Sequence, residues 1–103
     1  MSFSFMIKAA SKAEAKTAIA FELSKVAQAQ PIHELDRGHI QQVAELYVDA
    51  FPAIALPEGR DLCVTVNGSL GWRGTYPTDY TMSSMNVGVG LYTAPRATVP
   101  HAA

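Results

Sequence analysis

Apolar and polar residues alternate at the start of the chain, where Phe3, Phe5, Ile7 and Ala9 fall on one side of an extended backbone. A period of two residues is typical of a strand that buries one face. We therefore expect the chain to open with a strand over residues 2–9.

The pattern then changes to helical spacing. Ser11 and Glu14 match a capping box, in which the serine hydroxyl accepts a hydrogen bond from the amide three residues on and the glutamate reaches back. Four apolar residues follow at helical spacing: Ala15, Ile19, Leu23 and Val26. We expect a helix that begins at Ser11 and ends before Pro31, whose ring disfavours helical geometry in the preceding residue.

A second helix is predicted to open at Asp36, an acceptable N-cap residue, and to stop at Pro52. Its expected apolar stripe contains Ile40, Val43, Tyr47, Ala50 and Phe51. Residues 52–59 hold two prolines and a glycine and are interpreted as a connecting loop.

Strict alternation returns in residues 61–67 and 83–93, which predicts two further strands. In the first strand Cys63 and Thr65 are expected to face outward. The residues expected to face inward are Leu62, Val64 and Val66 in the first strand, and Met85, Val87, Val89 and Leu91 in the second.

The element order is therefore β-α-α-β-β, which predicts an α+β fold with two helices packed on one face of a three-stranded antiparallel sheet. We expect one domain over residues 1–94 and a flexible tail over residues 95–103, where the sequence is short, proline-containing and aperiodic.

Composition narrows the class of protein. The formal net charge is −1 and the basic residues are scattered, so we expect no long nucleic acid as a partner. No export signal and no run of about 18 apolar residues occurs, so a cytoplasmic protein without membrane contact is expected. The single cysteine, Cys63, fits a reducing compartment. Only 17% of residues are charged, which favours an exposed apolar patch and a homo-oligomer.

The segment 67–81 is expected to be a loop with the richest side-chain chemistry in the chain. Aromatic rings there could stack on a planar ligand, and polar side chains could hydrogen-bond its anionic groups. The candidate ligand-binding residues are Trp72, Arg73, Tyr76, Asp79 and Tyr80. An equally weighted alternative is that the aromatic residues of this loop fold over the sheet edge instead.

Arg37 and Arg60 are further candidates for anion binding if the fold brings them toward that loop. His33, Asp36 and His39 include metal-ligand types, but their spacing matches no metal motif, so we predict no metal site. Helix capping and solvation explain this cluster better.

Two glycines, Gly88 and Gly90, lie on the outward face of the last predicted strand. Glycine weakens a strand unless something covers it, so Trp72, a second subunit or a ligand is expected to lie on that face, with a simple bulge as the alternative. Phosphate-binding, nucleophile-elbow and zinc-protease motifs are all missing, and Cys63 has no activating cation beside it in sequence. An enzyme and a bound cofactor are therefore not expected.

Residues 63–92 read CVTVNGSLGWRGTYPTDYTMSSMNVGVGLY, two alternating segments around a glycine-aromatic stretch, a pattern found in small phage and prophage proteins. Together with the preceding strand and paired helices, this layout resembles the phage-encoded Thoeris anti-defence family of nucleotide-signal sponges. The resemblance implies an oligomer that sequesters cyclic ADP-ribose-type signals, or in some members cyclic oligonucleotides, without catalysis in an infected bacterial host. It follows element order and carries over no individual binding residue.

The leading hypothesis is a small oligomeric protein that captures a nucleotide-derived messenger. One alternative is a phage inhibitor that contacts a bacterial defence protein directly through the same loop. Another is a small structural or assembly protein that uses its exposed sheet face for self-association only.

Overall fold

The computed structural model describes residues 2–29, 32–52, 55–75 and 79–96. Its elements are β1 (Ser2–Ala9), α1 (Lys12–Ala29), α2 (Glu34–Ala50), β2 (Arg60–Thr75) and β3 (Asp79–Pro95). The strands form one antiparallel sheet in the order β1-β2-β3. The predicted α+β fold with the order β-α-α-β-β is confirmed.

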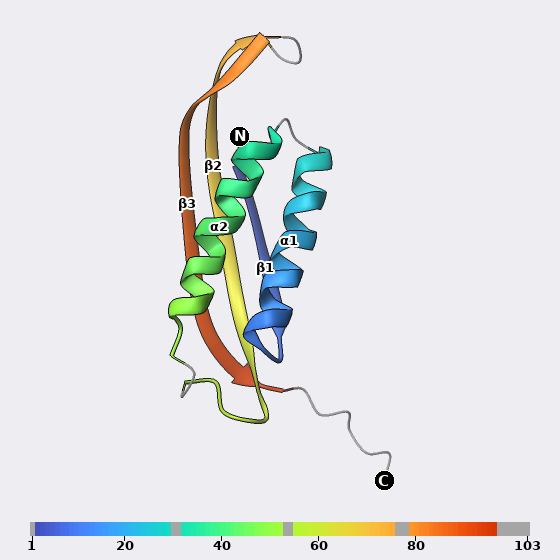
Figure 1. Cartoon of the computed structure of the whole chain (residues 1–103), viewed down its shortest axis with the longest axis vertical. Helices are drawn as coiled ribbons and strands as arrows, with labels where there is room; N and C mark the ends of the chain where they lie inside the picture. The colour runs from blue at the N-terminus through green and yellow to red at the C-terminus, as the bar shows by residue number, and fades with distance from the viewer. Residues whose placement is uncertain (1, 30–31, 53–54, 76–78, 97–103) are drawn as a thin grey trace.

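Both helices lie on the same face of the sheet, as Figure 1 shows. α1 packs mainly against β1 and α2 against β3, so β2 is the central strand beneath the helix pair. Buried side chains from β1, β2 and both helices form one core, against which partly buried residues of β3 pack. The core residues are Phe3, Ile7, Ala9, Ala15, Ile19, Leu23, Ile40, Ala44, Val48, Leu62, Val64, Val66 and Leu70.

The start of α1 confirms the capping interaction predicted from sequence. The backbone amide of Glu14 donates to Ser11 Oγ at 3.2 Å. The Glu14 carboxylate in turn accepts from the backbone amide of Ala10 at 3.0 Å, one residue earlier than the usual capping box. Two amides near the start of the helix therefore have side-chain partners.

The predicted start of the second helix was wrong, since the N-cap lies three residues before Asp36. α2 begins at Glu34, and His33 occupies the N-cap position with extended backbone angles (φ −65°, ψ 150°). Asp36 lies in the first turn of α2, where its negative charge interacts favourably with the helix dipole. It does not occupy the N-cap position.

The predicted stripe of α2 was also partly wrong. Ile40, Ala44 and Val48 are buried, whereas Tyr47 is 51% exposed and Ala50 is exposed. A spacing of four residues keeps the buried side chains close to one line along the helix. The small Ala44 brings the helix near the sheet, a contribution that its low hydrophobicity hides in the sequence.

The largest correction concerns the segment predicted as a loop over residues 67–81, because its described residues, 67–75 and 79–81, belong to strands. β2 continues to Thr75 and β3 begins at Asp79, and residues 76–78 lie outside the described residues. A bulge between Gly71 and Trp72 absorbs the irregularity in pairing. Glycine is tolerated in this part of β2 because the segment stays hydrogen-bonded to β3. Its glycine-rich composition therefore did not produce a turn.

This long hairpin extends past β1, whose pairing with β2 ends at Ser2 and Ser69. The remaining part of β2 and the facing part of β3 form a two-stranded arm that projects beyond the helices in Figure 1. At the other end of the sheet, the Arg96 amide donates to Gly59 O at 2.9 Å and its Nε contacts Asp61 Oδ1 at 3.0 Å. The rest of the predicted tail, residues 97–103, lies outside the described residues.

Candidate functional site

Of the aromatic residues predicted to bind a ligand, Trp72 is the one whose side chain the structure describes. Trp72 is half-buried and packs against the hydrophobic core. Asp79 and Tyr80 begin β3, where they pair with Thr75 and Gly74. Tyr76 lies outside the described residues. Trp72 thus follows the alternative prediction, in which the aromatic side chains pack against the protein's own sheet.

The three candidate arginines are separated. Arg73 is exposed on the arm. Arg60 lies at the opposite end of β2, where its Nε donates to Thr93 Oγ1 and its Nη2 donates to Thr93 O, both at 3.0 Å. Arg60 therefore fastens the end of β3 to β2. Arg37 lies in neither place but between the helices.

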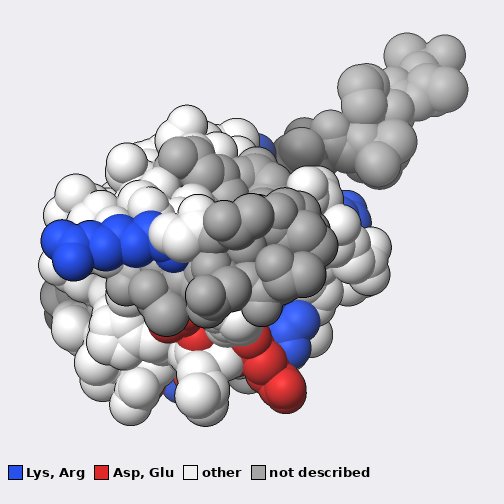
Figure 2. All heavy atoms as spheres, turned by 90° about the horizontal axis from the view of Figure 1, so that it is seen from above, with Lys and Arg blue, Asp and Glu red and all other residues white. Residues whose placement is uncertain are grey.

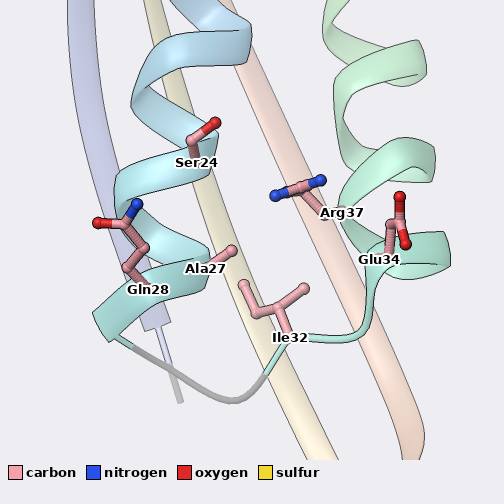
Figure 3. A pocket seen from close by; sticks show the side chains of 6 residues that line it. All are labelled: Ser24, Ala27, Gln28, Ile32, Glu34 and Arg37. Carbon is pink, nitrogen blue, oxygen red and sulfur yellow. The ribbon is translucent and has the colours of Figure 1, made fainter.

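Arg37 lines a cavity of about 500 Å³ at the junction of the two helices, shown in Figure 3. α1 contributes its last turns to this cavity, the connection contributes one apolar residue, and α2 contributes its first turn. The lining residues are Ser24, Ala27, Gln28, Ile32, Glu34 and Arg37.

Helical spacing explains how these side chains meet. Ser24 and Gln28 are one turn apart on α1, and Glu34 and Arg37 are one turn apart on α2, so each pair shares a helix face. The Arg37 side chain points from α2 toward α1 in Figure 3. Ser24 Oγ donates to Ala20 O at 3.0 Å, so its lone pairs remain available as acceptors.

Three polar side chains of this cavity have no partner among the residues that the structure describes. They are the Gln28 amide, the Glu34 carboxylate and the Arg37 guanidinium. A guanidinium binds phosphate or carboxylate oxygens, a carboxylate accepts from hydroxyls, and an amide can do both. The site can therefore bind a ligand that carries both anionic and hydroxyl groups.

Sequence reasoning found Arg37 but missed the side chains around it. The pairs at 24 and 28 and at 34 and 37 have ordinary surface spacing for helices, and their meeting depends on how the two helices pack. One feature of the sequence could have predicted that these side chains meet: both pairs lie beside the short connection between the helices. Helices joined by a short connection usually pack as antiparallel neighbours.

A second, shallower cavity of about 400 Å³ lies along β2 and β3, lined by Asn67, Gly68, Ser69, Asn86, Val87 and Gly88. A Cβ built on Gly88 would meet nothing within 4 Å, so no described segment covers this glycine. Trp72 packs against the core on the helix side and does not provide the cover that was predicted.

Cys63 was predicted to face outward and is nevertheless fully buried. Tyr92, its partner across the β2–β3 ladder, extends so that its hydroxyl lies 3.4 Å from Met6 Sδ on β1. Met6 and Tyr92 thus cover the thiol from the outer side of the sheet. The charge on Cys63 and the hydrogen bond between the two side chains raise the pKa of Tyr92, and burial adds to the shift.

Metal-ligand side chains provide no competing site in the described part of the chain. No three His, Cys, Asp or Glu side chains come together there in a way that could hold a metal ion. In the view from above, the coloured Lys, Arg, Asp and Glu side chains form no large patch of one charge (Figure 2). Among the described helices, none combines the length and apolar character needed to cross a membrane.

Comparison with known proteins provides no family assignment, since no family model, curated protein or solved structure matches the chain.

Proposed function

We propose that this protein is a non-catalytic binding protein that holds a small ribonucleotide-derived anion in the cavity between α1 and α2. The observation that supports this most is the Arg37 guanidinium, which faces α1 across the cavity without an ion-pair partner among the described residues. A guanidinium of this kind favours an anionic ligand.

The composition of the cavity favours a nucleotide over a simple anion. Arg37 and Glu34 together have no net charge, so Glu34 opposes a bare phosphate or sulfate. A ribonucleotide offers phosphate oxygens to Arg37 and ribose hydroxyls that donate to Glu34. Ala27 and Ile32 provide apolar surface for the base, and the Gln28 amide can pair with its polar edge.

The volume is consistent with this ligand class. A cavity of about 500 Å³ lies within the usual range of about 300–1,000 Å³ for small-molecule sites. In the specific form implied by the resemblance to the Thoeris anti-defence family, the ligand is a cyclic ADP-ribose-type or cyclic nucleotide signal. The protein would sequester that signal, unchanged, in the cytoplasm of an infected bacterium.

Calorimetric titration with ADP-ribose, its cyclic isomers and a set of cyclic nucleotides tests the proposal. We expect Arg37→Ala to weaken binding by about 10- to 100-fold, as expected for the loss of a charge-assisted contact worth about 1.5–3 kcal/mol. Arg73→Ala is the matched control, since it removes the same charge from an exposed position on the arm. Chromatography of the ligand after incubation should return it unchanged.

Two outcomes would refute the proposal. One is equal loss of affinity in Arg37→Ala and Arg73→Ala, which would place binding outside the cavity or make it a general charge effect. The other is the absence of binding by every nucleotide tested.

A second candidate function is direct contact with a bacterial defence protein. Large apolar side chains on the helices favour it, because Phe21, Leu35 and Leu46 are each more than 60% exposed. This candidate replaces the first if no nucleotide binds.

A further inference from the structure

The outer edge of β3 is an open strand edge with an unusual composition. β3 is 17 residues long and pairs with β2 alone. From Tyr80 to Pro95 it contains no acidic or basic residue. Proteins usually protect an open edge with charged side chains or by keeping the strand short. The opposite edge, β1, has only eight residues and carries Lys8.

The hydrogen-bonding phase of β3 shows which backbone groups face this open edge. The Arg96 amide points to β2, where it donates to Gly59 O, and Thr65 Oγ1 reaches Gly90 O from the same side. In an antiparallel strand, alternate residues direct both backbone groups to the same side. The pairing of β2 with β3 has no shift between Leu70 and Arg60, so even-numbered residues of β3 face β2 throughout this stretch.

The odd-numbered residues therefore direct their amide and carbonyl groups away from β2. These residues are Met85, Val87, Val89 and Leu91. No hydrogen bond within the described part of the chain joins their outward groups to another segment. The edge thus has a row of backbone donors and acceptors ready for a further strand.

A flank of α2 continues this surface. Ile40, Ala44 and Val48 face the sheet, while Asp49 faces α1, where it pairs with Lys16. At 100° per residue, Val43, Leu46 and Tyr47 fall on the side of α2 away from α1. Because α2 packs against β3, the part of this flank next to the buried stripe, Val43 and Tyr47, lies above the open edge, where Tyr47 is 51% exposed.

We propose that a second copy of this chain pairs with this edge, β3 against β3 in antiparallel orientation, to give a continuous six-stranded sheet with four helices on one face. An antiparallel pair of identical strands obeys a two-fold axis, so the edge is its own complement. The same axis brings together two copies of the apolar α2 flank. The uncharged strand means that no like charges of β3 meet across the axis.

This inference concerns assembly and is independent of the proposed ligand. A strand from a different protein could use the same backbone groups, but it would need its own apolar cover for Val43 and Tyr47. A second copy supplies that cover by symmetry.

Analytical ultracentrifugation across a dilution series tests the dimer and its surface. The wild type is expected to show twice the 11.1 kDa chain mass at the higher concentrations. Val89→Pro removes an amide that points away from β2, so it leaves the β2–β3 ladder intact. By symmetry it removes that donor twice, and we expect the dimer dissociation constant to rise by about tenfold or more.

Gly88→Lys provides a second test that does not depend on proline being tolerated. A side chain at Gly88 meets no neighbour within its own chain. With the two-fold axis at Gly88, the centre of the outward-facing stretch from Met85 to Leu91, a lysine there places two like charges opposite each other. Ser69→Lys is the matched control, because Ser69 is exposed on the same sheet but belongs to the central strand.

The proposal is supported if Val89→Pro and Gly88→Lys, with unchanged circular dichroism, sediment as monomers under conditions in which the wild type and Ser69→Lys are dimers. It is also supported if amide exchange at Val87, Val89 and Leu91 slows as the dimer forms. A wild type of 11.1 kDa at every concentration overturns it. A dimer that survives both edge variants, or that Ser69→Lys dissociates, also overturns it by placing the contact elsewhere.

Discussion

Substituting Gly68 with alanine tests how β1 and β2 pack together. Gly68 is directly opposite Phe3 in the antiparallel ladder, and a Cβ built on this glycine would overlap the Phe3 ring. Phe3 is itself buried and stacks on Phe5, with ring centroids 6.2 Å apart. The ring therefore has little room to move away from a new methyl group.

The expected change in the free energy of unfolding is a balance of two effects. Overpacking a core costs about 1–3 kcal/mol. Replacing glycine by alanine lowers the conformational entropy of the unfolded chain, which stabilises the folded protein by about 0.4–1 kcal/mol. We expect Gly68→Ala to destabilise the protein by about 1–2 kcal/mol, and a domain of this size loses about 4–8 °C of Tm for each kcal/mol.

Urea denaturation followed by circular dichroism measures this change, with Gly88→Ala as the matched control. The control adds the same methyl group to a strand position with nothing within 4 Å, so it is expected to be neutral or slightly stabilising. Phe3→Leu should remove the overlap and reduce the cost of Gly68→Ala in a double-mutant cycle. The reasoning is refuted if Gly68→Ala is as stable as Gly88→Ala at equal protein concentration.

Four further outcomes follow from local contacts. Ser11→Ala should lower the free energy of unfolding by about 0.5–2 kcal/mol in chemical denaturation, because the Glu14 amide loses its partner, and an unchanged midpoint would contradict the cap. Cys63→Ala should lower the pKa of Tyr92 toward about 10. The titration of Tyr92 is identified as the tyrosine signal that disappears in Tyr92→Phe. An unchanged pKa in Cys63→Ala would exclude Cys63 as the cause of the shift. Because the folded-state pKa of Tyr92 is raised, its contribution to stability is constant below about pH 10 and is lost as the pH rises through the folded-state value. In native protein, Cys63 should react with a thiol reagent only at the rate of unfolding, and rapid labelling would show that Met6 and Tyr92 do not cover it.

The sequence predicted the element order and most of the first helix because these features depend on local pattern. Alternation in residues 2–9 and the spacing of Ala15, Ile19 and Leu23 report burial directly, and β1 and α1 have those faces. The capping box of Ser11 requires only residues three positions apart.

The errors arose where tertiary contacts outweighed local preference. Tyr47 has more apolar surface than Ala44, yet Ala44 is buried because it lies between Ile40 and Val48 on the face of α2 that meets the sheet, whereas Tyr47 lies on the flank. Gly68 and Gly71 suggested a loop, but Phe3 lies over Gly68 and a bulge follows Gly71, so both remain in a strand. Neither contact can be predicted from residues near the glycines in the chain.

The candidate site shows the same limit. A guanidinium at Arg37 was predicted to bind an anion, but its neighbours Gln28 and Glu34 depend on the packing of one helix against the other. Trp72 looked suited to stacking because its surroundings in sequence are rich in glycine and tyrosine. Its position on the helix side of the sheet, against the core, follows from the strand register instead.

The most direct test of the proposed binding site is an NMR titration of the isotope-labelled protein with ADP-ribose and with a cyclic nucleotide. We expect the largest shifts in the Gln28 side-chain amide, the Arg37 guanidinium and the backbone amides of residues 32–37. Arg37→Ala should raise the nucleotide concentration needed for the Gln28 and backbone shifts by about 10- to 100-fold, while leaving the rest of the spectrum intact. Shifts confined to the arm around Arg73, or none with any nucleotide, would contradict binding in the cavity between the helices.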